Sequence, residues 1–258
     1  MNHPTQYPLL VFALSFVALW LSSWIGWWFR KWQGTLDEEL REDFGFILAA
    51  TLTLLGLIIG FSFSMATTRY DQRKNYEEAE ANAIGTEFVR ADLLPAADAA
   101  TARTLLRKYL DERVLFYMSH DGQELQQVNA RTAQLQAELW TAIRVPAAAD
   151  RSAVMALVVS GMNDVLNSQG YTQAGYWDQI PTGAWVLMAA IGIGCNLLVG
   201  YGSHSTQAGI KLLPILPLIV SIAFIPIADI DSPRHGIIPV RPQNLISLAA
   251  SLPPGGIP

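Results

Sequence analysis

The chain has 258 residues, of which 51% are hydrophobic and only 15% are charged, and its formal net charge is −5. Soluble domains usually carry about 25% charged residues, so the composition indicates an integral membrane protein with a sizeable polar part. The acidic balance gives no support for a nucleic-acid partner. The single cysteine, Cys195, excludes a disulfide scaffold and a cysteine-based zinc site.

Four apolar segments are candidate membrane-spanning helices, and they cover residues 9–29, 44–67, 184–201 and 212–230. About 20 apolar residues are needed to cross a bilayer, so the third segment is at the short end of the range. The first segment ends in a cluster of tryptophans followed by Arg30 and Lys31, which is typical of an interfacial aromatic belt. It does not read as a signal peptide, because no basic residue precedes it and no small-residue cleavage site follows it.

Polar helices are predicted between the second and third apolar segments, over residues 71–94, 99–119, 124–144 and 150–167. Pro146 is expected to end the third of these helices, and Asp150 or Ser152 to cap the start of the fourth. No strand pattern competes. Residues 231–258 are rich in Pro and Gly, so we expect an irregular tail.

The predicted fold is therefore all-α, with four transmembrane helices and a helical cytoplasmic extension between the second and the third. The expected divisions are 1–68 for the first two membrane helices, 69–183 for the cytoplasmic region, 184–230 for the last two membrane helices and 231–258 for the tail. Basic residues near the membrane ends are slightly more numerous on the side of both termini, which favours cytoplasmic termini.

The second apolar segment sorts its small and hydroxyl-bearing residues onto one face. On a wheel turning 100° per residue, a wedge about 140° wide holds that set; its members are Thr53, Gly56, Leu57, Gly60, Phe61, Ser64, Thr67 and Thr68. Lipid tails gain nothing from Gly, Ser or Thr, so this face is expected to meet protein or water.

Two interpretations of this face stay open. Gly56 and Gly60 form a GxxxG pair, extended by Ser64, and such stripes let helix backbones approach closely. Leu57 and Phe61 lie one turn apart on the other edge, where apolar side chains suit a constriction at an oligomer axis.

Basic residues follow at the water boundary, where Arg69, Arg73 and Lys74 act either as snorkelling anchors or, in a symmetric oligomer, as a basic mouth that favours anions.

Other polar residues are weighed against structural roles. Glu77, Glu78, Glu80 and Glu87 are expected on a solvated helix face or at contacts between subunits, with a weak site for a hard cation as the alternative. Asn196 is predicted to make an interhelical hydrogen bond. The sequence holds no nucleophile motif, phosphate loop or catalytic dyad, so we expect no enzyme, no cofactor and no metal site.

Two stretches carry a family resemblance. Residues 60–95, "GFSFSMATTRYDQRKNYEEAEANAIGTEFVRADLLP", closely resemble the signature of bacterial bestrophin-like membrane proteins of uncharacterised function. Residues 227–236, "IADIDSPRHG", resemble the second signature of the same group, which follows the last membrane helix. More distantly, the chain is similar to bestrophins, which are pentameric anion channels with four membrane helices per subunit and cytosolic helices between the second and third.

The resemblance implies a pore neck on the second membrane helix. In bestrophins, apolar residues one turn apart line the neck around a Gly-Phe pair, and a Thr-Arg pair follows eight residues later. Gly60-Phe61 and Thr68-Arg69 keep this spacing. The resemblance therefore implies that Phe61 and Leu57 are the neck residues.

Two departures from bestrophins are visible. Thr53, one turn before Leu57, stands where a bestrophin has an aliphatic residue. Calcium-responsive bestrophins carry an acidic run after the last membrane helix, whereas this chain has only Asp229 and Asp231 there, beside Arg234 and His235. We expect a local ion pair and turn at a helix end and carry over no calcium site.

Taken together, the sequence and the resemblance predict a homo-oligomeric ion channel, with a pentamer favoured, that conducts anions such as chloride. Its second helix would line the pore, with Leu57, Phe61 and Thr53 at the neck. The alternative is a non-conducting membrane scaffold or signalling subunit whose cytoplasmic helices bind a partner. In either case we expect a lipid-embedded protein of the bacterial inner membrane, with the termini and the long loop in the cytoplasm.

Overall fold

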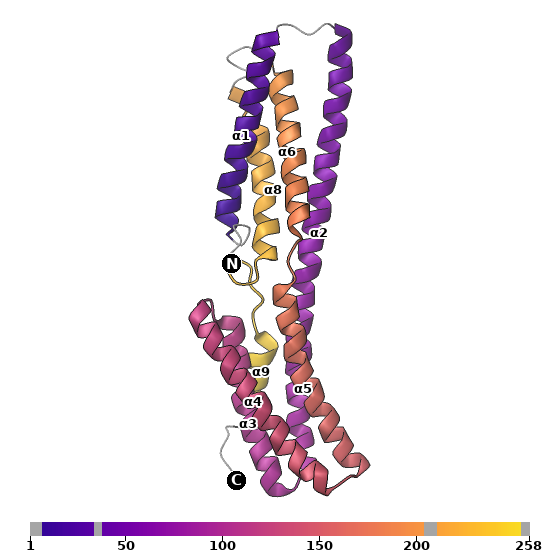
Figure 1. Ribbon diagram of the computed structural model, residues 1–258, viewed down its shortest axis with the longest axis vertical. Helices are drawn as coiled ribbons and strands as arrows, with labels where there is room; N and C mark the ends of the chain where they lie inside the picture. Colours follow the sequence, from indigo (N-terminus) through magenta and orange to yellow (C-terminus); the bar gives the residue numbers. More distant parts are fainter. Residues whose placement is uncertain (1–6, 34–37, 204–210, 254–258) are drawn as a thin grey trace. The chain divides into compact units, whose positions relative to one another are not determined.

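The computed structural model describes residues 7–33, 38–203 and 211–253, and every regular element in those ranges is helical. The elements are α1 (Pro8–Gln33), α2 (Glu38–Arg90), the 3-10 turn η2 (Ala91–Leu93), α3 (Ala96–Met118), α4 (Gly122–Ala149), α5 (Ala153–Trp177), α6 (Thr182–Gly202), α8 (Ile215–Asp231) and α9 (Gln243–Ser251) (Figure 1). The predicted all-α class is confirmed.

The chain divides into two compact units. The first unit comprises Met1–Tyr70 and Gln179–Pro239, and the second unit comprises Asp71–Asp178 and Val240–Pro258. Helix α2 contributes to both. The two breaks before and after the long insertion lie within a few residues of the divisions expected at 68/69 and 183/184, whereas the C-terminal segment belongs to the second unit.

Close helix packing holds the first unit together, with α1 lying against α6 and α8 (Figure 1). A Cβ on Gly26 of α1 would overlap the carbonyl oxygen of Leu197, and a Cβ on Gly200 of α6 would overlap the carbonyl oxygen of Ser23. Glycines at these two positions therefore let the backbones touch. The Ser23 hydroxyl donates to Asn196 Oδ1 across the same interface at 3.3 Å, which confirms the predicted interhelical bond.

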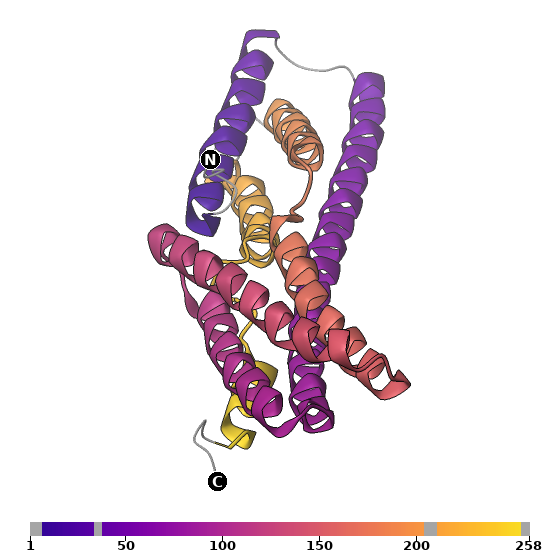
Figure 2. The same ribbon diagram turned by 60° about the horizontal axis from the view of Figure 1, so that its bottom comes forward.

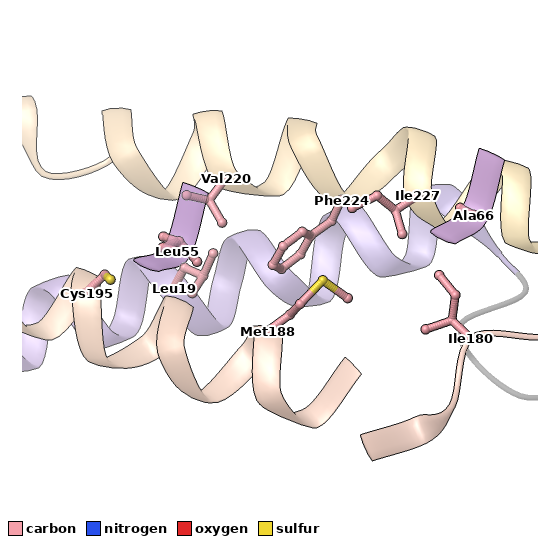
Figure 3. Packing of buried hydrophobic residues seen from close by; sticks show 9 residues of the cluster. All are labelled: Leu19, Leu55, Ala66, Ile180, Met188, Cys195, Val220, Phe224 and Ile227. Atoms are coloured by element: carbon pink, nitrogen blue, oxygen red, sulfur yellow. The ribbon is translucent and has the colours of Figure 1, made fainter. Parts of the chain in front are cut away.

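The apolar core of the first unit lies between the four helices α1, α2, α6 and α8 (Figure 3). Its buried side chains are Leu19, Leu55, Ala66, Ile180, Met188, Cys195, Val220, Phe224 and Ile227. Cys195 behaves as a small hydrophobe, and its Sγ donates to the Thr51 carbonyl of α2 at 3.3 Å. These contacts determine which side of α2 packs against the other helices of the first unit.

Three stretches of helix are long and apolar enough to cross a membrane, within Pro8–Gln33, Arg41–Leu93 and Ala153–Gly202. They contain the predicted segments 9–29, 44–67 and 184–201. The predicted fourth segment, 212–230, is interrupted by a turn at Leu213 and Pro214, so that α8 has 17 residues. At 1.5 Å per residue α8 is about 26 Å long, slightly less than the roughly 30 Å hydrocarbon layer.

In the second unit, α3 packs on α4 and α4 packs on α5 (Figure 2). Local sequence sets the helix starts. The Asp121 carboxylate accepts from the Gln123 and Glu124 backbone N–H groups at the start of α4, and the Ser152 hydroxyl accepts from the Met155 N–H at 3.2 Å at the start of α5. Of the two predicted caps, Ser152 therefore caps α5.

Three boundary predictions are wrong. The helix predicted over residues 150–167 runs instead from Ala153 to Trp177. Helix α4 continues through Pro146 to Ala149. Pro146 lies in the last turn of α4, where its missing N–H removes one hydrogen bond near the end of the helix. The tail expected to be irregular contains α9, whose Leu245 is fully buried.

Candidate functional site

Helix α2 is the least covered of the apolar helices. Only 6% of its most apolar stretch is buried, compared with 22% for α1 and 28% for the stretch that ends in α6. A membrane helix that its own chain leaves so uncovered has a large surface for lipid, for another subunit or for water.

The wedge predicted from the wheel lies on the uncovered side of α2 in the first unit, which also includes Leu54, Phe63 and Met65. Leu57 and Phe61 are 52% and 66% exposed, and Thr53, Ser64 and Thr68 are exposed as well. A Cβ on Gly56 or on Gly60 would meet nothing within 4 Å. Among the described residues, none packs closely along this GxxxG edge.

The threonine hydroxyls on this side are already satisfied by the helix itself. Thr53 donates to the Ala49 carbonyl at 2.9 Å and Thr68 donates to the Ser64 carbonyl at 2.9 Å. Each hydroxyl uses its proton in a hydrogen bond within the helix. Its oxygen can still accept a hydrogen bond from outside. This side of α2 can consequently face either an apolar or a hydrated environment.

The same sector of the helical wheel stays uncovered where α2 belongs to the second unit. Its exposed members there are Asp71, Lys74, Asn75, Glu78, Asn82, Thr86 and Val89. Each unit, taken by itself, buries the opposite sector, which holds Leu55, Ser62 and Ala66 in the first unit and Arg73, Glu80, Ile84 and Glu87 in the second. We call the uncovered residues, from Thr53 to Val89, the α2 stripe.

The three basic residues expected at the water boundary differ in their exposure. Lys74 is exposed on the α2 stripe and Arg69 is half-buried. Arg73 is only 2% exposed, and its side chain packs beside Gly175 of α5. The reason is the helical phase, since Arg73 falls on the covered sector of α2.

The expectation that the glutamates of α2 form a solvated face is wrong for three of the four residues. Glu78 is exposed, but Glu77, Glu80 and Glu87 are no more than 2% exposed. They lie on the covered sector, where α3, α5 and α9 provide polar partners for two of them.

Glu80 is the centre of a buried polar network. Its carboxylate forms an ion pair with Arg113 of α3, and accepts from the Thr172 hydroxyl at 3.0 Å and from the Tyr117 hydroxyl at 3.2 Å. Burial, and then the Glu80 carboxylate, raise the pKa of Tyr117, so its phenol stays protonated and remains a donor. This network fixes how α3 and α5 pack on α2.

Glu77 binds the start of α9. Its carboxylate accepts from Asn244 Nδ2 at 2.6 Å and from the Leu245 N–H at 2.9 Å. It thereby receives N–H groups at the start of α9, where the helix dipole favours a negative charge.

Glu87 is buried without such partners. Neither of its carboxylate oxygens accepts a hydrogen bond from the described part of the chain. Burial raises the pKa of Glu87 to about 8, although Arg90 opposes the rise. Gly161 of α5 lies directly against this carboxylate and Arg90, and a Cβ there would overlap both side chains.

The acidic residues do not gather into a metal site in the residues that the structure describes, where no group of three or more His, Cys, Asp or Glu side chains could hold a metal ion.

The second signature forms a tight turn after α8, as expected. The two Asp229 oxygens accept from the Ile237 N–H at 2.6 Å and from the Ile238 N–H at 3.0 Å, and Asp231 accepts from the Ile180 N–H at 2.8 Å. A Cβ on Gly236 would overlap the Asp229 carbonyl oxygen, so the turn requires glycine. Both carboxylates thus hold backbone in place.

Sequence reasoning missed the Glu80 network and the α9 contact. A usable signal existed in the helical phase, because Glu77, Glu80 and Glu87 follow Leu55, Ser62 and Ala66 on one sector of a continuous helix. Arg113, by contrast, gave no local signal, since its pairing with Glu80 spans 33 residues.

Known proteins share this architecture. A family model described as Bestrophin-like domain matches residues 11–245. A bacterial bestrophin homologue from Klebsiella pneumoniae, solved by zinc phasing, is 13% identical, with 95% of this chain and 99% of that chain covered and a TM-score of 0.59. A single-substitution variant of that homologue is 12% identical over 93% of this chain and 97% of that chain, with a TM-score of 0.58. No curated protein matches.

The fold and the apolar helices define an all-helical membrane protein with a second, largely polar helical unit. The match to the family model covers most of the chain, and this chain belongs to the bestrophin-like family.

Proposed function

We propose that this protein is a homo-oligomeric ion channel in which the α2 stripe of every copy faces a common axis. The observation that carries the proposal is the uncovered sector of α2, which both units leave open. Membership of the bestrophin-like family supports a channel. We propose four membrane spans per subunit, with α8 as the fourth, and a pentamer, as the resemblance of the sequence to bestrophins implies.

The proposed neck consists of Leu57 and Phe61, with Thr53 one turn further along α2. Leu57 and Phe61 project from the helix surface, and rings of such apolar side chains gate pores by excluding water. Gly56, Gly60 and Ser64, on the other edge of the stripe, allow the α2 helices of neighbouring copies to approach closely.

We propose anions, such as chloride, as the permeant ions. Lys74 is the exposed cation of the stripe and would repeat as a ring in a symmetric oligomer, with Arg69 and the buried Arg73 adding to the local positive potential. Asp71 and Glu78 share the stripe, so the selectivity depends on the order of these rings along the axis. The proposed location is the bacterial inner membrane, with the second unit and the termini in the cytoplasm.

The test is current through the purified, verified oligomer in a planar bilayer under a chloride gradient. The double variant Leu57→Ala/Phe61→Ala widens the proposed neck and should raise conductance or alter selectivity. Phe63→Ala is the matched control, because Phe63 is also exposed but lies about 160° around the helix from Phe61. The absence of current under any voltage or salt gradient would overturn the proposal.

A second candidate is a non-conducting scaffold or signalling subunit whose second unit binds a partner. The exposed aromatic side chains near the end of α5 favour it, since Trp177 is 75% exposed and Tyr171 is 59% exposed. A stoichiometric partner in pull-downs from native membranes, together with an oligomer that passes no current, would select this candidate.

A further inference from the structure

A pocket of about 340 Å³ lies in the first unit, where the end of α1, the start of α2 and the end of α6 meet. Its lining includes the apolar side chains of Phe44, Leu48, Val199 and Leu213 and two cations, Arg30 and Arg41. On α2, Phe44 and Leu48 fall on the covered sector, so the pocket is separate from the α2 stripe. Nothing in the proposed channel function uses it.

The pocket lies at a boundary between apolar and polar chain. The apolar runs of α1 and α6 end at Phe29 and Tyr201, and the apolar run of α2 begins at Phe44. Next to it, Lys31 Nζ lies 5.5 Å from the centre of the Trp27 ring. Aromatic and basic residues at helix ends mark the level of the lipid headgroups. A ligand in this pocket would therefore have one end in hydrocarbon and the other at the headgroup level.

The side chain of Arg30 is held at the pocket by the aromatic ring of Tyr201. Its guanidinium carbon lies 5.7 Å from the centre of the Tyr201 ring. That ring packs on Phe44 at 5.6 Å, and its hydroxyl donates to Gln33 Oε1 at 2.7 Å. The contact with the Tyr201 ring thus positions the cation, and no carboxylate from the described side chains pairs with it.

Within the part of the chain that the structure describes, one end of the Arg30 guanidinium has no hydrogen-bond acceptor. Its Nη1 is buried and donates no hydrogen bond to any residue in the described ranges. Of the described side chains at the start of α2, the carboxylates of Glu42 and Asp43 are exposed and do not line the pocket. A buried guanidinium nitrogen without an acceptor favours an anionic oxygen from outside the chain.

From this combination we infer that the pocket binds the headgroup of an anionic phospholipid, such as phosphatidylglycerol. The phosphate accepts from Arg30, and the first carbons of an acyl chain lie against the apolar walls. Arginine suits this role because its planar guanidinium presents forked donors that match the geometry of a phosphate group. A free anion would satisfy Arg30 but would leave the apolar wall without a partner, which favours the lipid.

The test measures lipid retained by the purified protein with native mass spectrometry, using phosphatidylglycerol and phosphatidylcholine with identical acyl chains. Wild-type protein should retain phosphatidylglycerol over phosphatidylcholine. Arg30→Gln should lower retention of phosphatidylglycerol about tenfold, the size expected for losing a hydrogen bond to a charged group. Lys31→Gln is the matched control, since it removes the same charge from the neighbouring residue outside the pocket, and it should change retention less than twofold.

Three outcomes would overturn the inference. Equal retention of the two lipids by the wild-type protein removes the selectivity for an anionic headgroup, and this comparison stands even if Arg30→Gln does not fold. Equal losses in the two variants would reduce the effect to general surface charge. Complete displacement of phosphatidylglycerol by millimolar inorganic phosphate would identify a free-anion site in place of a lipid site.

Discussion

Replacing Glu87 with glutamine should make the second unit less sensitive to alkaline pH. Glu87 is 1% exposed and its pKa rises from 4.5 to about 8 on folding. Well below pH 4.5 the carboxyl group is protonated in both the folded and the unfolded chain, so it does not change the stability with pH there. Between pH 4.5 and about 8 the unfolded chain ionises while the folded chain holds its proton, so stability falls as the pH rises.

The size of this effect follows from the two pKa values. The interval between 4.5 and about 8 corresponds to roughly 5 kcal/mol of unfolding free energy, reached in full only above the folded pKa. Glutamine has nearly the same shape and cannot ionise. The stability advantage of Glu87→Gln over wild type should therefore be near zero at pH 4 and grow to several kcal/mol at pH 9.

The assay is thermal unfolding of the purified protein in detergent, followed by circular dichroism across that pH range. Glu78→Gln provides the control, because Glu78 is exposed on the α2 stripe and should show no pH-dependent advantage. An advantage of Glu87→Gln that is constant with pH, or one that Glu78→Gln shares, would refute the burial of an uncompensated carboxyl group at Glu87.

Three further predictions concern helix packing, the buried ion pair and the turn after α8. Gly200→Ala should destabilise the first unit by about 1–3 kcal/mol because its methyl group meets backbone of α1, whereas Gly194→Ala, which meets nothing within 4 Å, should be neutral or stabilising in thermal unfolding. Arg113→Met should cost about 3–5 kcal/mol by leaving Glu80 buried without its cation, and adding Glu80→Gln should recover much of that loss in a double-mutant cycle. Asp229→Ala should increase amide hydrogen exchange at the turn after α8, since two backbone N–H groups lose their acceptor.

Much of the helical framework follows from local sequence. Apolar runs of bilayer length located α1, α2 and α6, and Ser152 located the start of α5 through capping chemistry. Helix α9 could not be located in this way, because it has nine residues and an isolated helix of that length is not stable in water. It is held by Glu77, 168 residues away in sequence from its Leu245 partner.

The candidate site shows the same division between local and distant information. Helical phase alone separates the α2 stripe from the covered sector, since both follow from one period over a continuous helix. Charge was a poor guide to exposure on that helix. Glu80 is buried because Arg113, Tyr117 and Thr172 converge on it from α3 and α5, and only the tertiary fold brings these residues together.

The most direct test of the central claim is modification of a thiol at the proposed neck during current recording. Phe61→Cys is introduced into the oligomer, and a negatively charged methanethiosulfonate reagent is applied while current flows through a planar bilayer. The native Cys195 is buried, so wild-type current should not change. The account predicts that the reagent alters or blocks current through Phe61→Cys and leaves Phe63→Cys unaffected. Unchanged current through Phe61→Cys after verified modification would contradict it.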